Sequence, residues 1–425
     1  MIYDPPLAIF SANMKIKIPV SPQNSVPMRK GVGMFSPEKR SLPVALLHMV
    51  LAGVLTVCMA GASATDDGKI IVPDLQPAVA GLGVSGRSFR MGFTTWPVDA
   101  TVEGVEAAYA FINKHADITA IHLDGGVPWQ EMLDKKPFPK HIQDDFKHIC
   151  AHRSAANPLY VATTPLNFGR TGLADYRDTA ENQPLPAAWR GLSLNDPKVK
   201  RAYLTYLQGV VEQLRPDYLA VGIEVNILLA KNEAQWKACK ELNSYVYGEL
   251  KKLYPGLPVF VTVQYEYLKG VETGSRHNRQ RQEPEVRELM KYSDFLGLSS
   301  YQYGPLHHAV PTDYFDMAAT FGKPVALAES GAISQTLHYG GVALTATPAD
   351  QENFEKVILS AAQRGGYVFV IGWTGMDFDR LINRLPASVR EIAGIWVHTG
   401  LADAQGTPKL ALGIWDTYFK APLKQ

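Results

Sequence analysis

From about Arg90 onward, short apolar runs alternate along the chain with stretches whose apolar residues recur at helical spacing. Most of the apolar runs carry hardly any polar residue, which is typical of parallel strands that are covered on both faces. The predicted strands are Met91–Thr95, Ile118–Leu123, Leu159–Thr163, Tyr218–Ile223, Val259–Val263, Phe295–Ser299, Val325–Ala328 and Tyr367–Gly372. Amphipathic helices are predicted over Thr101–Asn113, Pro197–Leu214 and Glu233–Tyr254, and Thr347 is expected to cap a further helix.

Eight strands that alternate with helices predict an α/β fold, the (β/α)8 TIM barrel, over residues 90-425 as a single domain. The structural alternative is a doubly wound open sheet, which often carries a glycine-rich phosphate turn after its first strand. Here the first strand is followed by Thr94-Thr95-Trp96-Pro97, so this turn is missing. The sequence therefore favours the barrel, and it carries no phosphate or dinucleotide motif that would imply a cofactor.

The first 64 residues differ from the rest of the chain. They combine a leader without clear periodicity with a secretory signal: Lys39 and Arg40, the apolar stretch Leu42–Val57, and Ala62-Ser63-Ala64 as a cleavage site. We therefore expect residues 1-64 to be removed, residues 65-89 to form a linker, and the protein to be exported to the periplasm or the medium. A lipid anchor at Cys58 is the alternative, although Val57 stands where a small residue is expected.

The net charge limits the classes of partner that we expect, and the cysteine content bears on disulfide formation. Lys+Arg 42 against Asp+Glu 41 leaves a formal net charge of +1, so there is no basic surplus to attract nucleic acid or an anionic membrane. Apart from the N-terminal anchor, no membrane contact is expected. Cleavage would leave two cysteines, Cys150 and Cys239, which could pair in an exported protein or stay free thiols in helices.

Two of the predicted strands run into a glutamate, Glu224 after the fourth and Glu329 after the seventh. An unpaired buried carboxylate is costly, so such a charge points to a task. In a TIM barrel both carboxyls can point into one cleft, and a separation of about 5 Å would suit retaining glycoside hydrolysis. The neighbouring charge and partial burial would raise the pKa of the acid. The structural alternative is that one or both glutamates are salt-bridged to barrel arginines.

The other predicted strand ends carry aromatic and polar side chains that suit a sugar. Aromatic rings stack on the apolar faces of sugar rings, and polar groups bind the hydroxyls, so we expect a carbohydrate substrate. The candidate substrate-binding residues are Trp96, His122, Asp124, Asn226, Gln264, Tyr301, Tyr303 and Trp373.

Three of these strand-end residues suggest more specific roles. Tyr301 could donate a hydrogen bond to Glu329, and Trp373 could form the floor of a sugar subsite. His122 and Asp124 could bind a metal ion, but without a clear third ligand we predict no metal. Glu266 could bind a sugar or pair with Arg276, and the sequence does not decide between these.

Three motifs resemble the clan A glycoside hydrolases, and most closely the family 53 endo-β-1,4-galactanases. Val221-Gly222-Ile223-Glu224-Val225-Asn226 resembles that family's Val-Gly-Asn-Glu-Ile-Asn, Asp294 to Tyr301 its Asp-Ile-Ile-Gly-Leu-Ser-Tyr-Tyr, and Val325 to Gly331 its Val-x-Val-x-Glu-Thr-Gly. The resemblance implies that Glu224 is the acid/base and Glu329 the nucleophile. Ile223 departs from the pattern, because the family has an asparagine there that binds the substrate 2-hydroxyl.

The resulting hypothesis is an exported, retaining glycoside hydrolase that acts on a β-linked glycan, galactan-like or related, through two glutamates. The first alternative is a glycan-binding barrel without activity, because Ile223 replaces the usual asparagine. The second is a metal-dependent barrel hydrolase that uses His122 and Asp124.

Overall fold

The structure is a computed structural model that describes residues 70–271, 279–302, 307–385, 390 and 392–424. The predicted leader and signal, residues 1-64, lie outside this range, as do Tyr303 and Arg276.

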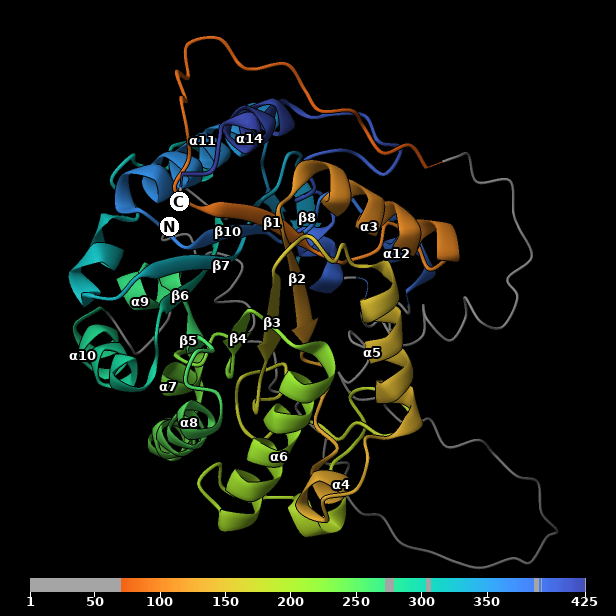
Figure 1. Cartoon of the computed structure of the whole chain (residues 1–425). Helices are drawn as coiled ribbons and strands as arrows, with labels where there is room; N and C mark the ends of the chain where they lie inside the picture. The colour runs from red at the N-terminus through yellow and green to blue at the C-terminus, as the bar shows by residue number, and fades with distance from the viewer. Residues whose placement is uncertain (1–69, 272–278, 303–306, 386–389, 391, 425) are drawn as a thin grey trace, which may run out of the picture.

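Eight parallel strands close into a barrel in the order β1-β10-β7-β6-β5-β4-β3-β2, which confirms the (β/α)8 prediction (Figure 1). The barrel strands are β1 Arg90–Thr94, β2 Ile118–Leu123, β3 Leu159–Thr163, β4 Tyr218–Ala220, β5 Val259–Gln264, β6 Leu296–Gln302, β7 Val325–Ala332 and β10 Phe369–Gly372. A separate antiparallel hairpin follows β7 and consists of β8 Leu337–Tyr339 and β9 Val342–Leu344.

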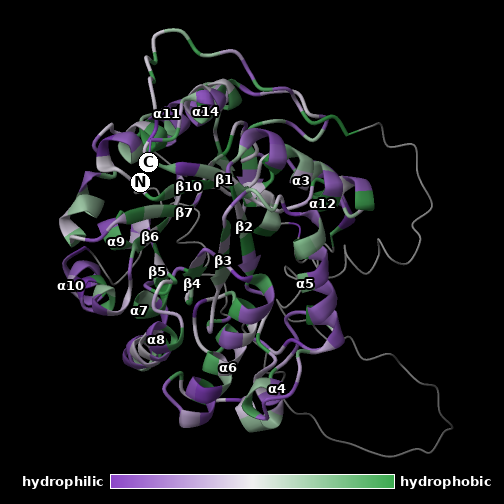
Figure 2. Cartoon of the chain, viewed as in Figure 1, coloured by the Kyte–Doolittle hydropathy of each residue, from purple (hydrophilic) through white to green (hydrophobic). Residues whose placement is uncertain are grey.

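Helices surround the barrel, and the outward faces of helices such as α5 and α10 are hydrophilic (Figure 2). The α-helices are α3 Val102–His115, α4 Trp129–Leu133, α5 Lys140–His152, α6 Pro197–Leu214, α7 Ile227–Lys231, α8 Glu233–Leu253, α9 Tyr265–Lys269, α10 Arg279–Leu289, α11 Pro348–Gly365, α12 Asp379–Arg384 and α14 Leu410–Lys420. Short 3-10 helices are η1 Ala187–Trp189, η2 Met290–Tyr292, η4 Asp316–Phe321 and η5 Gly394–Trp396. The predicted cap at Thr347 is confirmed, because Thr347 and Asp350 form a capping box at the start of α11.

The strands have two buried faces, which explains their apolar sequences. One face packs against the helices in the main core, and the other fills the barrel interior with residues such as Ile118, Ala120, Phe369 and Ile371. Side chains alternate along a strand, so the next inward position of β2 after Ala120 is His122. The interior is therefore apolar, and functional side chains begin where the strands reach its C-terminal mouth.

The N-terminal segment that the sequence assigned to a linker lies against the outside of the barrel, where it crosses α14 (Figure 1). The backbone N–H of Gln76 donates to Asp416 Oδ2 at 2.7 Å, and that of Val79 donates to Thr417 Oγ1 at 2.9 Å. Asp416 also forms a fully buried pair with His115 at 2.8 Å. Residues 70–89 are thus anchored to the last helix.

Two further expectations concern the cysteines and the membrane. Cys150 is exposed and Cys239 is buried, and both are free thiols. Within the part of the chain that the structure describes, no helix combines the length and the apolar character needed to cross a membrane.

Candidate active site

Glu224 and Glu329 both lie at the mouth of the barrel, and irregularities in their strands turn them inward. Along β7, Leu327 pairs with Leu298 but Glu329 pairs with Ser299, so Ala328 is one extra residue in the strand. This bulge lets Glu329 follow the inward-facing Ala328 on the same side of the sheet. Bulges of this kind commonly redirect a side chain next to an active site.

A left-handed backbone conformation, and not a bulge, turns Glu224 inward, and it also ends the strand before this residue. Its φ of 49° is left-handed, which is unusual for a residue with a side chain. Its backbone N–H donates to Thr262 Oγ1 at 2.9 Å, which fixes the turn. The predicted strand to Ile223 therefore ends at Ala220. Gly222 allows the close approach, since a Cβ there would lie 2.6 Å from Val225 Cγ1.

Two side chains hold the Glu224 carboxylate. Ser299 donates from its hydroxyl to Glu224 Oε1 at 2.7 Å, and Arg170 Nη2 lies 3.4 Å from Glu224 Oε2. Because Ser299 is also the β6 partner of Glu329, one serine links the two glutamate strands. Arg170 comes from the loop after β3 and not from a barrel strand, and it forms an ion pair with Glu224, so the alternative that one or both glutamates are salt-bridged to arginines applies to Glu224.

Glu329 has its own partners, and it is the more buried of the two carboxyls. Tyr301 donates its hydroxyl to Glu329 Oε1, as the sequence predicted, and His122 Nδ1 lies 3.6 Å from Oε2. Burial, together with the nearby Glu224 charge, raises the pKa of Glu329 to about 8, while the Tyr301 hydrogen bond and Arg170 act in the opposite direction. Asp124 adds a smaller upward effect on this pKa.

This electrostatic pattern differs from the expectation that the strand-four acid would hold the proton. Among the described residues, burial and the Glu224 charge raise the pKa of Glu329, whereas the arginine contact of the pair is to Glu224. Two coupled carboxyls titrate as a pair, so the raised pKa of Glu329 keeps a proton on the pair near neutrality. A pair with one proton is what general acid and nucleophile require together.

A wall of aromatic rings stands beside the carboxyl pair. The ring centroids of Trp96 and Trp373 are 5.5 Å apart, Trp373 and Trp396 are 6.4 Å apart, and His122 lies 5.6 Å from Trp373. Tyr301 continues the row at 6.3 Å from Trp396. Within the described residues, the indole N–H groups of all three tryptophans are buried and have no hydrogen-bond partner. The wall offers flat apolar faces together with unused donors, which suits a sugar ring.

Two of the predicted substrate-binding residues form hydrogen bonds within the protein. Asn226 is fully buried: its amide donates to the carbonyl of Gln264 and to Gln282 Oε1, both at 3.0 Å, and its Oδ1 accepts from Gln264 N at 2.7 Å. Gln264 donates to Glu266 Oε2 at 2.6 Å and accepts from Tyr267 N at 2.7 Å. Both amides tie the β4 and β5 ends together, and Asn226 uses both of its N–H donors for this.

The alternation of β6 determines which described residues contact Glu266, while Arg276, its other predicted partner, lies outside them. Ser299 and Tyr301 face the barrel mouth, whereas Ser300 and Gln302 face outward and donate to Glu266 Oε1 at 2.7 and 3.0 Å. Glu266 is buried in this cage, where burial raises its pKa to about 7. Its role in the described structure is to hold the end of β5 and the start of α9.

Ile223, which carried the argument for an inactive barrel, also has a structural position. Its side chain is 2% exposed and belongs to the apolar cluster that fills the barrel interior. The left-handed turn at Glu224 directs the isoleucine down into the core and the glutamate up into the mouth. The isoleucine does not present an apolar surface to the site, but it leaves the position without the amide found in the family that the motifs resemble.

Sequence reasoning missed three residues of the site, which are Arg170, Ser299 and Trp396. Arg170 lies in a loop and Trp396 in the short 3-10 helix η5, where a residue's direction cannot be inferred from periodicity. The signal for Ser299 was present, because it lies two residues before Tyr301 and therefore on the same face of β6.

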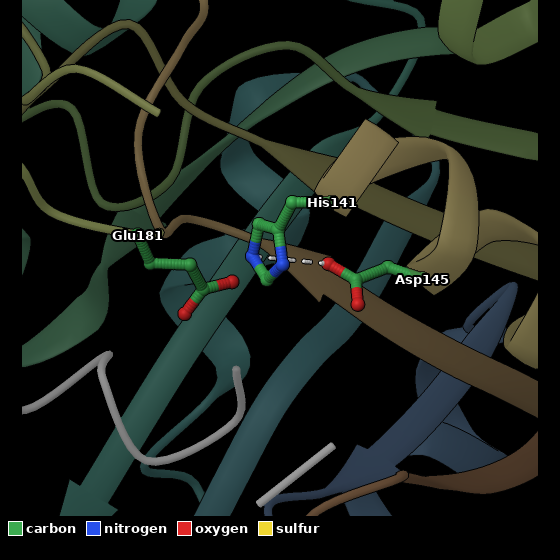
Figure 3. Close-up of side chains that lie close together, drawn as sticks. All are labelled: His141, Asp145 and Glu181. Atoms are coloured by element: carbon green, nitrogen blue, oxygen red, sulfur yellow. Dashed lines mark ion pairs between the residues drawn. The ribbon is translucent and has the colours of Figure 1, made fainter. Parts of the chain in front are cut away.

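A cluster of residues of the kinds that bind metal ions lies elsewhere in the described part of the chain. This cluster does not include His122 or Asp124. His141, Asp145 and Glu181 have ligand atoms within 4.8 Å of one another (Figure 3). However, Arg177 lies between the two carboxylates, with Nη2 2.8 Å from Glu181 Oε1 and a closer contact to Asp145. Its guanidinium already neutralises the pair, so this cluster is a buried ion-pair network.

Comparisons with known proteins agree with the fold. No protein-family model matches the sequence, and no curated protein matches it either. Among solved structures, the chain is similar to an exo-β-1,4-mannosidase from Opitutaceae bacterium strain TAV5, with a TM-score of 0.56 and 14% identity over 84% of this chain and 62% of that one. It thus spans less than two thirds of that protein.

Two further solved structures are similar over most of their length. GH5_18 from Streptomyces cattleya, in complex with GlcNAc, gives a TM-score of 0.54 and 15% identity over 78% of this chain and 80% of that one. GH5_18 from Bifidobacterium longum subsp. infantis gives 0.54 and 15% over 79% and 80%. At such identities the likeness concerns the fold, the TIM barrel, and the chemistry must be argued from this chain's own residues.

Proposed function

We propose that this chain is a retaining glycoside hydrolase that acts on a β-linked glycan, galactan-like or related. The observation that supports this most is the placement of Glu224 and Glu329 at one barrel mouth, where Ser299 donates to Glu224 and pairs with Glu329 across the strands, and where burial and the Glu224 charge raise the pKa of Glu329. The aromatic wall beside the pair supplies the surface for a sugar ring. The motif resemblance assigns Glu224 as acid/base and Glu329 as nucleophile.

In the first step, Glu224 donates a proton to the glycosidic oxygen while Glu329 attacks the anomeric carbon and the bond to the leaving group breaks. In the second step, Glu224 removes a proton from water, the water attacks the same carbon, and the bond to Glu329 breaks. Since burial raises the pKa of Glu329, this mechanism requires that the proton lies on Glu224 when the substrate is bound. The hydrogen bond from Tyr301 stabilises the ionised Glu329 that this requirement implies.

The test is a panel of 4-methylumbelliferyl β-glycosides, with β-galactoside, β-mannoside and β-glucoside, together with β-1,4-galactan. Glu224→Gln and Glu329→Gln are each expected to lower kcat/KM by at least about 1,000-fold, because each role contributes several kcal/mol to the barrier. Glu355→Gln is the matched control, since Glu355 is also a buried carboxyl with a pKa raised to about 8, but it lies on α11.

Three outcomes of this panel separate the hypotheses. Losses below about tenfold in both active-site variants would show that the assigned pair is wrong. Binding of oligosaccharides without turnover would favour the inactive glycan-binding barrel. Loss of activity on chelation would favour the metal-dependent alternative.

We also propose that the protein is exported, which is supported by Lys39, Arg40, the apolar stretch Leu42–Val57 and the small residues before Thr65. Expression of the full chain in a Gram-negative host, followed by mass measurement of the periplasmic product, tests this. We expect the mature chain to begin at Thr65. A lipidated product that begins at Cys58 would favour the anchor, and an unprocessed cytoplasmic product would contradict export.

A further inference from the structure

The loop after β3 holds Arg170 next to Glu224, and hydrogen bonds fix the shape of this loop. The loop after β3 folds back on itself, with Asn167 N donating to the Gly172 carbonyl at 3.0 Å and Arg170 at its tip in a left-handed conformation, φ 52°. Lys231 Nζ and Asn232 Nδ2 bind the loop carbonyls of Gly169 and Thr171 at 3.0 and 2.7 Å. The arginine is thus positioned by α7 and by the residue that caps α8.

The guanidinium of Arg170 is buried but poorly satisfied. Its side chain is 7% exposed, yet its contacts to the carbonyls of Asn167 and Phe168 are both 3.3 Å and its contact to Glu224 is 3.4 Å. The Nε atom has no hydrogen-bond partner among the described residues. Buried arginines normally make short, charge-assisted hydrogen bonds, so a guanidinium with only long contacts is prepared for a further acceptor.

The other polar groups around Glu224 form hydrogen bonds within the protein. Asn226 and Gln264 bind neighbouring protein groups, and the hydroxyl hydrogen of Ser299 goes to Glu224 Oε1. Ile223 occupies the position of the amide that contacts the 2-hydroxyl in the family that the motifs resemble, and its side chain lies in the barrel core. Of the two side chains that hold the Glu224 carboxylate, only Arg170 has a donor, Nε, without a hydrogen-bond partner among the described residues.

We infer that Arg170 takes over the role of the missing amide and donates a hydrogen bond to the 2-hydroxyl of the sugar whose glycosidic bond is cleaved. This inference rests on the proposed function. A 2-hydroxyl hydrogen bond strengthens as charge develops at the neighbouring anomeric carbon, so the contact contributes to the transition state more than to binding. A guanidinium can serve either an equatorial or an axial hydroxyl, because its donors form a fan.

The test is a cycle between the protein side chain and the substrate group. The substrates are 4-nitrophenyl β-D-glucoside, 4-nitrophenyl β-D-mannoside and their common 2-deoxy parent, and the variants are Arg170→Met and Arg170→Lys. Arg201→Met, on the exposed face of α6, is the control. The ratio of kcat/KM for the hydroxylated and deoxy substrates is measured in each protein, so the intrinsic reactivity of the deoxy sugar cancels between proteins.

We expect Arg170→Met to reduce this ratio between about 10- and 100-fold relative to the wild type, which is the range for a hydrogen bond to a charged group. Arg170→Lys should retain part of the ratio. If the methionine variant does not fold, the lysine variant still tests the inference, because its activity on the deoxy substrate shows that its site is folded. Arg201→Met should leave the ratio unchanged.

Two results would overturn the inference, and they are distinguishable. Equal losses on hydroxylated and deoxy substrates in both Arg170 variants would mean that Arg170 acts only through Glu224. If the wild-type protein turns over only the galactoside, the cycle is run with 4-nitrophenyl β-D-galactoside and its 2-deoxy analogue. Absence of turnover on these glycosides and on the whole panel by the wild-type protein would overturn the proposed function, and this inference with it.

Discussion

Removal of the Tyr301 hydroxyl should shift the alkaline limb of the activity profile. Tyr301 donates to Glu329, and this hydrogen bond lowers the pKa of a carboxyl that burial and Glu224 have raised to about 8. A hydrogen bond to a charged group is worth about 1.5–3 kcal/mol. Since 1.36 kcal/mol corresponds to one pKa unit, Tyr301→Phe should raise the pKa of Glu329 by about one to two units.

The direction of the pH effect follows from the need for one proton on the pair. Above the pKa of Glu329 the pair loses its last proton, so kcat/KM of the wild type should fall as the pH rises through about 8. In Tyr301→Phe this fall should move to between about pH 9 and pH 10, while kcat at the optimum decreases because the ionised nucleophile has lost a donor.

The assay is kcat/KM from pH 5 to pH 10.5 for the best substrate of the panel, about half a pH unit apart, with Tyr314→Phe as control. Tyr314 also donates to a buried carboxyl, Glu266, at 3.2 Å, but on the outward side of β6. An alkaline limb that stays in place in Tyr301→Phe, or that moves to lower pH, would refute the reasoning.

Three other perturbations have defined outcomes. Among the described residues Glu355 Oε1 is buried without a hydrogen-bond partner, and burial raises the pKa of Glu355 to about 8. The folded state therefore loses stability as the pH rises from about 4.5 through 8. In urea, the free energy of unfolding of Glu355→Gln should exceed that of the wild type by about 3–5 kcal/mol at pH 8 and differ little from it at pH 4.5. Equal stabilities at both pH values would contradict this. Asn226→Ala should lower the free energy of unfolding by about 2–4 kcal/mol while KM changes less than about twofold, and a large KM effect with unchanged stability would restore its predicted sugar contact. Gly222→Ala brings a Cβ to 2.6 Å from Val225 Cγ1 and should lower kcat at least about tenfold by displacing Glu224, which steady-state kinetics would detect or exclude.

The barrel itself could be predicted because its signals are local and repeated. The predicted strands Ile118–Leu123 and Leu159–Thr163 agree with β2 and β3, and the helix Pro197–Leu214 agrees with α6, since each has a clear period and a clear end. The strands of the two glutamates were less predictable. One stops early at Ala220 and the other continues to Ala332, because a left-handed turn and a bulge depend on contacts with neighbouring strands.

The site could be predicted from the sequence only in part, for the same physical reason. Glu224, Glu329 and Tyr301 could be placed together because each follows from counting along a strand. Asn226 could not be assigned, because whether a buried amide faces a cleft or Gln282 is decided by a helix that lies 56 residues further along the chain. Arg170 reaches Glu224 from a loop 54 residues earlier, and nothing in the local sequence indicates its direction.

The central claim is that Glu224 and Glu329 perform double displacement, with Glu329 as the nucleophile. The most direct test is incubation with the 2,4-dinitrophenyl 2-deoxy-2-fluoro β-glycoside of the sugar preferred in the panel, followed by peptide mass spectrometry. We predict a stable adduct on the peptide that contains Glu329, at one sugar per chain. An adduct on Glu224, or turnover of the panel substrate with inversion at the anomeric carbon and no adduct, would contradict the account.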